Sequence, residues 1–90
     1  MNRGAQSEVP RAAGSGVIHG KTVTCRYSIF QPAVTQWVAI GVVTFEDDDI
    51  PVLAVETASN PKDALVQLQT RVTELNVQQN RRAAAALATV

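Results

Sequence analysis

The chain lacks the residues that support several common classes of function. Its only cysteine is Cys25, which excludes an intramolecular disulfide and a multi-cysteine metal site. Eight basic and eight acidic residues cancel, so no net charge attracts a nucleic acid or an anionic membrane. No window approaches the ~18 consecutive apolar residues of a membrane-spanning helix. These absences favour a small globular domain of 90 residues.

The start of the sequence shows no pattern for export or for ordered structure. Residues 1–8 lack the apolar run of a signal peptide, and a single cysteine suits a reducing compartment. We therefore expect a cytoplasmic protein. Residues 1–16 are rich in Gly, Ser and Ala and have no helical or strand periodicity, which predicts a disordered N-terminal tail.

The aromatic residues all fall within two strand-like segments: Tyr27, Phe30, Trp37 and Phe45. The first segment begins at residue 21 and stops before Pro32, and its apolar and polar side chains alternate. The apolar positions are Val23, Cys25, Tyr27 and Ile29. This period predicts a strand with one buried face, and Pro32 is expected to end it because proline cannot donate to a ladder.

The second segment, residues 37–46, differs in that both of its faces are apolar. One face contains Trp37, Ala39, Gly41, Val43 and Phe45, and the other contains Val38, Ile40 and Val42. A strand with two apolar faces is normally central in its sheet and covered on both sides. Gly41 in its middle predicts a bulge or the close approach of another backbone.

An acidic run at residues 46–49 predicts a turn, and a third strand follows over residues 50–57. Pro51 places that strand at an edge of the sheet. Asn60 is a favourable N-cap, Pro61 suits the first helical position, and an apolar stripe follows at Leu65, Leu68, Val72 and Leu75. The stripe breaks near residues 76–77, where we expect the helix to end.

We therefore predict an α+β fold, in which a three-stranded antiparallel meander precedes one amphipathic helix packed on one sheet face. Residues 17–77 form the single domain. Residues 78–90 form an Ala-rich tail, which we expect to be frayed or weakly helical because a short isolated helix is marginal in water.

No group of residues in the sequence matches a known catalytic or metal-binding pattern. His19 and Cys25, expected on one strand, would lie ~20 Å apart at ~3.3 Å per residue, too far for a nucleophilic pair. The acidic run lacks the spacing of an EF-hand, so we interpret it as a solvated turn. We predict no enzyme activity, no catalytic residue, no cofactor and no metal site.

Three strands and a helix over residues 21–76 resemble the C-terminal part of a double-stranded-RNA-binding domain in their arrangement. The resemblance implies a helix before the strands and a lysine-rich start of the final helix. Here the final helix opens with Pro61, Lys62 and Asp63, so one lysine is offset by one acid. Arginines on the two predicted tails would allow a weak electrostatic contact with phosphate groups: Arg3, Arg11, Arg81 and Arg82. Weak nucleic-acid binding is therefore the alternative function.

The second apolar face of the central strand, which contains Val38, Ile40 and Val42, points to a partner. The helix covers one face, expected to be that of Val43, and leaves the other uncovered. A second copy of the chain, a different protein or the tail at residues 78–90 are the candidate covers, and symmetric dimers are the commonest oligomers. A similar arrangement occurs in small antitoxin-like and regulatory domains that bind a protein through an open sheet. We predict a non-enzymatic interaction or regulatory module that forms a homodimer.

Overall fold

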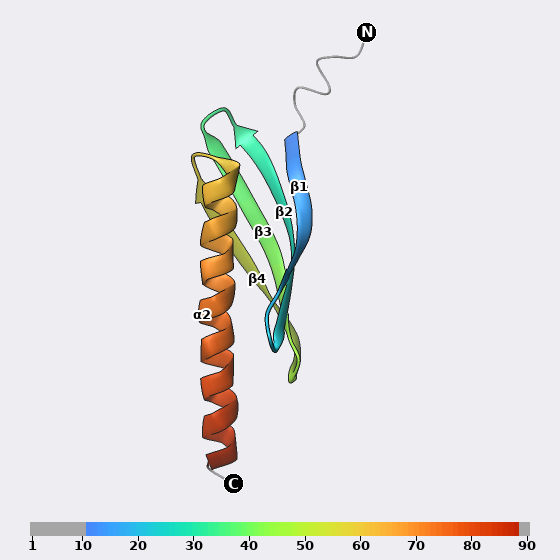
Figure 1. Ribbon diagram of the computed structural model, residues 1–90, viewed down its shortest axis with the longest axis vertical. Coiled ribbons are helices and arrows are strands. Elements are labelled where there is room, and N and C mark those ends of the chain that lie inside the picture. Colours follow the sequence, from blue (N-terminus) through green and yellow to red (C-terminus); the bar gives the residue numbers. More distant parts are fainter. Residues whose placement is uncertain (1–10, 89–90) are drawn as a thin grey trace.

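The computed structural model of the chain describes residues 11–88, with side chains from residue 14 onward. The elements are β1 (Arg11–His19), β2 (Val23–Ala33), β3 (Gln36–Phe45), β4 (Asp48–Ala58) and α2 (Pro61–Ala88). The strands form one antiparallel sheet in the order β1-β2-β3-β4, and α2 lies along one face of it (Figure 1). The predicted α+β class, a meander followed by one helix, is confirmed. No helix within residues 11–88 has the length and apolarity needed to cross a membrane.

The sheet contains a fourth strand, β1, that the sequence analysis assigned partly to a disordered tail. Residues 11–16 pair with β2 through the backbone, although they carry little apolar surface. The pairing gives hydrogen-bond partners to the backbone N–H and C=O groups along the edge of β2. Hydrogen bonds rather than side-chain burial therefore explain the order of residues 11–16. Residues 1–10, the rest of the predicted tail, lie outside the described part of the chain.

Pro32 lies within β2 and does not end it, contrary to the prediction. Strand β2 continues to Ala33, and its register with β3 is irregular between Phe30 and Ala33. Proline is tolerated in a sheet at such an irregularity, where the ladder bond that it cannot donate is already missing. The Gln31 side chain donates to the Val34 carbonyl oxygen at 2.8 Å and closes the turn into β3.

The core lies between α2 and the face of the sheet that contains Val43. Its buried residues are Val23, Cys25, Ile29, Ala39, Val43, Phe45, Ala54, Ala64, Leu68 and Val72. Gly41 is the point of closest packing, since a Cβ there would overlap the Cys25 Sγ atom and lie 3.4 Å from both Leu68 Cδ atoms. The prediction of a bulge or a close backbone at Gly41 is wrong, because its pairing with Tyr27 and Ala54 is regular and the atoms that approach it are side chains.

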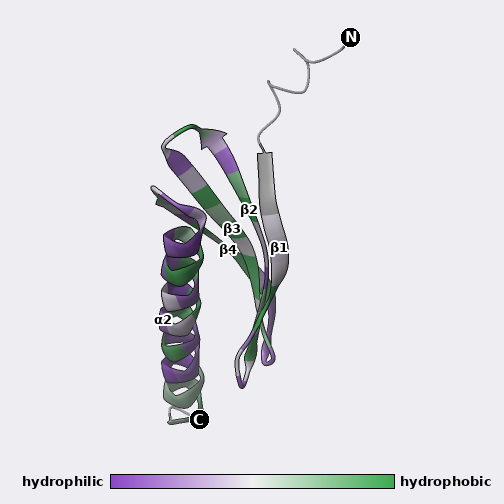
Figure 2. Cartoon of the chain, turned by 45° about the horizontal axis from the view of Figure 1, so that its top comes forward, coloured by the Kyte–Doolittle hydropathy of each residue, from purple (hydrophilic) through white to green (hydrophobic). Residues whose placement is uncertain are grey.

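The helix begins at the predicted residues. The Asn60 side chain accepts from the Asp63 backbone N–H at 2.8 Å and donates to the Asp63 carboxylate at 2.9 Å. Pro61 occupies the first helical position. Green and purple alternate along α2 in Figure 2, as expected of a helix with one apolar stripe.

The helix does not end near residues 76–77, where the apolar stripe breaks, but continues to Ala88. Residues 78–88, which we predicted to be frayed or weakly helical, are part of α2. Helix nucleation is the costly step, and here the nucleus is already anchored on the sheet by Leu68 and Val72. Each further Gln, Arg or Ala then extends the helix at little cost, because none is a poor helix former. In Figure 1 the last turns of α2 run past the end of the sheet.

Candidate interaction surface

The side of the sheet that faces away from α2 is called the open face here. The strand registers place Val38 between Phe30 and Thr57, Ile40 between Ser28 and Val55, and Val42 between Arg26 and Leu53. On β1, Val17 lies opposite Arg26. The apolar residues of the open face are Val17, Phe30, Val38, Ile40, Val42, Leu53 and Val55.

Exposure increases along the open face from one end of β3 to the other. Val38 is only 9% exposed and Ile40 is half-buried, whereas Val42 is 45% exposed. On β4, Leu53 is 65% and Val55 is 49% exposed. The exposed apolar surface is therefore centred between Val42 and β4, and Val38 contributes little to it.

The open face is almost without charge. Among the described residues, Arg26 is the permanently charged side chain in the registered pairs of this face, His19 lies at its margin, and Asp49 follows the same alternation as Leu53 at the turn end of β4. The remaining polar positions carry hydroxyl groups: Ser15, Thr24, Ser28, Thr44 and Thr57. The surface therefore offers apolar contact rather than a field of one charge sign.

The three predicted surface residues, Val38, Ile40 and Val42, thus lie on one face, but they make up only part of the apolar surface there. Leu53 and Val55 are two residues apart in the third predicted strand, and this alternation could have placed both of them on the open face. Phe30 is out of phase with the apolar positions of its strand, which places it on the open face. Val17 was missed because β1 was not recognised as a strand.

His19 and Cys25 lie on neighbouring strands rather than on one strand as expected. Ile18 is opposite Cys25 and His19 is opposite Thr24, so the thiol and the imidazole project from opposite faces of the sheet. Cys25 is fully buried, and this burial raises the pKa of its thiol. A buried, protonated thiol is a poor nucleophile, so the pair has neither the contact nor the activation that catalysis needs.

The acidic run forms the hairpin turn between β3 and β4 only in part: the turn consists of Glu46 and Asp47, and Asp48 and Asp49 already belong to β4. The Asp48 carboxylate accepts from the Ile50 backbone N–H at 3.0 Å. The turn is also bonded to the turn between β1 and β2, since the Glu46 backbone N–H donates to the Thr22 carbonyl oxygen at 3.0 Å. Within residues 11–88, no three His, Cys, Asp or Glu side chains are placed so that they could hold a metal ion together.

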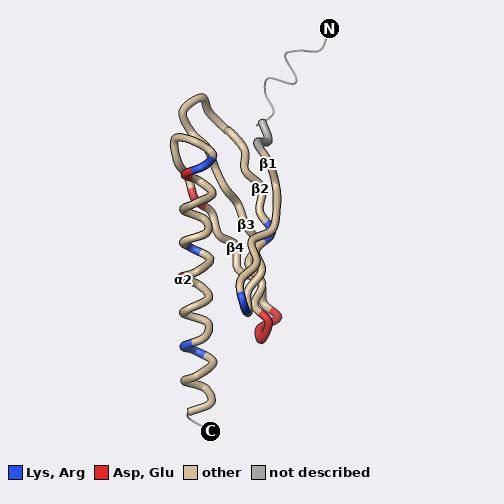
Figure 3. The backbone as a smooth tube through the Cα atoms, in the orientation of Figure 1, with Lys and Arg blue, Asp and Glu red and all other residues tan. Residues whose placement is uncertain are grey.

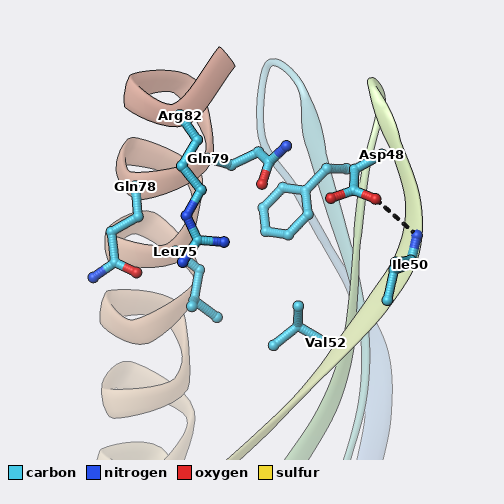
Figure 4. Close-up of a pocket in the computed structure, with 8 residues that line it drawn as sticks. Asp48, Ile50, Val52, Leu75, Gln78, Gln79 and Arg82 are labelled. Carbon is cyan, nitrogen blue, oxygen red and sulfur yellow. Dashed lines mark hydrogen bonds between the residues drawn. The ribbon is translucent and has the colours of Figure 1, made fainter. Parts of the chain in front are cut away.

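A shallow groove separates the C-terminal part of α2 from the end of the sheet near this turn. Its apolar lining comes from Phe45, Val52 and Leu75, and its polar lining includes Asp48 and Arg82, over a volume of about 310 Å³. Figure 4 shows Gln78, Gln79 and Arg82 on the helix side and Asp48 on the sheet side. The groove therefore offers both signs of charge around a small apolar floor.

The basic residues of the described part of the chain are spread along α2 and over the sheet (Figure 3). Arg71 forms ion pairs with Glu56 at 3.3 Å and Glu74 at 3.5 Å, and Arg26 lies on the open face. The helix that the RNA-binding resemblance implies before the strands is not found within residues 11–88, where β1 occupies that place. Nucleic-acid binding stays a prediction without support from this arrangement. No family model, curated protein or solved structure matches the chain.

Proposed function

We propose that this chain is a non-enzymatic interaction or regulatory module that self-associates through its open face. The observation that carries the proposal is the exposure of Val42, Leu53 and Val55, which lie side by side in register on two paired strands. Contiguous apolar patches on soluble proteins commonly mark sites of protein contact. The buried, unpaired Cys25 supports a reducing, cytoplasmic location.

The expected affinity follows from how much apolar surface remains to be buried. Full burial of a Val or Leu side chain contributes ~1.5 to 3 kcal/mol, and these three residues are 45–65% exposed. A two-fold interface buries each of them twice, so the three together contribute several kcal/mol. Association costs ~4 to 15 kcal/mol in lost motion. We therefore expect association through the open face to be reversible and to depend on concentration.

A second copy suits the open face better than a charged partner does. The face carries Arg26 near its centre and Asp49 at the turn end of β4, so it offers no field of one sign to an acidic or basic protein. Two sheets pack face to face with their strands aligned to within about 30°, and side chains of the two inner faces then interdigitate. Arg26 lies between Val17 and Val42, so its long side chain must extend to the rim of such a contact to keep the guanidinium group hydrated.

The proposal is tested by sedimentation equilibrium of two matched variants. Val42→Lys places a charge in the centre of the open face, and Val66→Lys places the same charge on α2. The two valines are 45% and 48% exposed, so neither substitution disturbs the core. We expect Val42→Lys to weaken self-association at least tenfold and Val66→Lys to leave it unchanged. A monomeric unmodified chain, or equal masses for the two variants, would contradict the proposal.

A further inference from the structure

The two edges of the sheet differ in how well they are protected against pairing with another strand. At the β4 edge, Pro51 has no N–H to donate, and the Asp48 carboxylate already accepts from the Ile50 N–H at 3.0 Å. Helix α2 also packs on β4 as closely as on β3. Proline, charged residues and a covering element are the usual means by which proteins block an edge strand.

The β1 edge has none of these three protections, and its one irregularity is a register shift against β2 between Ala12 and Gly14, which leaves the strand regular from Gly14 onward. Residues 12–18 of β1 contain no proline and no charged residue. Helix α2 packs on β4, β3 and β2, and Figure 1 shows β1 on the side of the sheet away from it. Gly14, Ser15 and Gly16 carry little or no side chain, so another backbone can approach them closely. Alternate N–H and C=O groups of an edge strand point outward, and here they meet no other described element.

We propose that β1 is a strand-addition surface, and that its partner is the β1 strand of a second copy in antiparallel orientation. Four strands from each copy then form one continuous sheet of eight. Ser15 is the central residue of Arg11–His19, so full overlap places Ser15 opposite Ser15 of the second copy and Gly14 opposite Gly16. The centre of the pairing therefore has no side-chain clash and no like charges facing each other.

Geometry connects this edge with the open face. The two-fold axis of such a pair is perpendicular to the sheet, so both α2 helices lie on one side and both open faces lie on the other. Val17 of each copy then stands next to the junction, and it is 46% exposed on that same face. Edge pairing extends the apolar surface across two copies. Combined with the proposed face-to-face contact, it gives a tetramer of two eight-stranded sheets.

The test separates the edge from the face by working in a variant that lacks face contact. Leu53→Lys introduces a charge at the most exposed apolar position of the open face, 65% exposed, and it should leave a dimer held through β1. Adding Ser15→Lys places two lysines opposite each other, and we expect sedimentation to show a halved mass. Adding Thr57→Lys instead, at an exposed position on the β4 edge, should leave the dimer intact.

The outcomes for edge and face are distinguishable. A monomeric Leu53→Lys variant would overturn edge pairing and leave the open-face dimer standing. A Leu53→Lys/Ser15→Lys variant that stays dimeric would also overturn it. If the unmodified chain has the same dimeric mass as the Leu53→Lys variant, pairing through β1 is supported and self-association through the open face is contradicted.

Hydrogen exchange on the unmodified chain gives a second readout that requires no substitution. The outward-pointing amides of β1 should exchange more slowly as protein concentration rises, while the outward amides of β4 should not change. Exchange in β1 that is independent of concentration, in a sample that sedimentation shows to be associated, would overturn the proposal.

Discussion

The two faces of β3 have nearly the same composition but very different surroundings. On the helix side, Ala39 and Val43 have no exposed surface, whereas on the open face Val42 is 45% exposed. The apolar residues of one strand are thus covered on one side of the sheet and partly exposed on the other. The difference arises because one helix can cover only one side of a sheet. This comparison is the basis for assigning the open face to a partner.

The largest expected difference between the two faces is in the free energy of unfolding after the same Leu→Ala substitution on each face. Leu68→Ala removes a side chain with no exposed surface, and the cavity it leaves should lower the free energy of unfolding by ~2 to 5 kcal/mol. Leu53→Ala on the open face should change it by ~0.5 kcal/mol or less in dilute protein. Urea denaturation at low concentration measures both. Equal losses would show that the open face is already covered within one chain.

A smaller effect is expected where the covered face is tightest. Gly41→Ala introduces a Cβ that overlaps Cys25 Sγ, and the overpacking should cost ~1 to 3 kcal/mol. Cys25→Ala removes the overlapping atom, so the double variant should be more stable than the sum of the single losses implies. Thermal denaturation of the four chains measures the coupling. Strictly additive losses would show that another contact limits the space at Gly41.

The smallest effect concerns pH, and it too reports on the covered face. Burial raises the pKa of the Cys25 thiol above its ordinary value of 9.0, so the folded protein retains the proton at a pH where the unfolded chain releases it. The stabilising contribution is therefore complete below pH 9 and is lost as pH rises towards the folded-state pKa. The slope is at most about 1.4 kcal/mol per pH unit.

The control for this prediction is Cys25→Ala, which keeps every other titrating group. The difference in unfolding free energy between the two chains should shrink as the pH rises above 9. A difference that is constant with pH would show that the thiol is accessible to solvent in the folded state.

Side-chain periodicity predicted those parts of the fold that depend on side-chain burial. The covered face of β3 and the cap at Asn60 follow from residue type and spacing alone. Strand β1 could not be predicted, because backbone bonds to β2 hold it and its Gly, Ser and Ala residues leave no period. The length of α2 was missed because the apolar stripe ends long before the helix does.

The candidate surface was predictable in its location but not in its limits. Val38, Ile40 and Val42 share a face because side chains alternate along a strand. Their exposures differ because Phe30 and Thr57 flank Val38, whereas Arg26 and Leu53 flank Val42. These neighbours come from other strands, and the register that brings them together depends on the turn and the irregularity around Pro32.

The central claim is that a second copy covers the open face, and methyl NMR spectra over a range of concentrations test it most directly. The methyl signals of Val42, Leu53 and Val55 should shift together on dilution with one dissociation constant. The methyls of Val66 and Val77, exposed on α2, should not move. Shifts confined to α2, or open-face signals independent of concentration, would contradict the account.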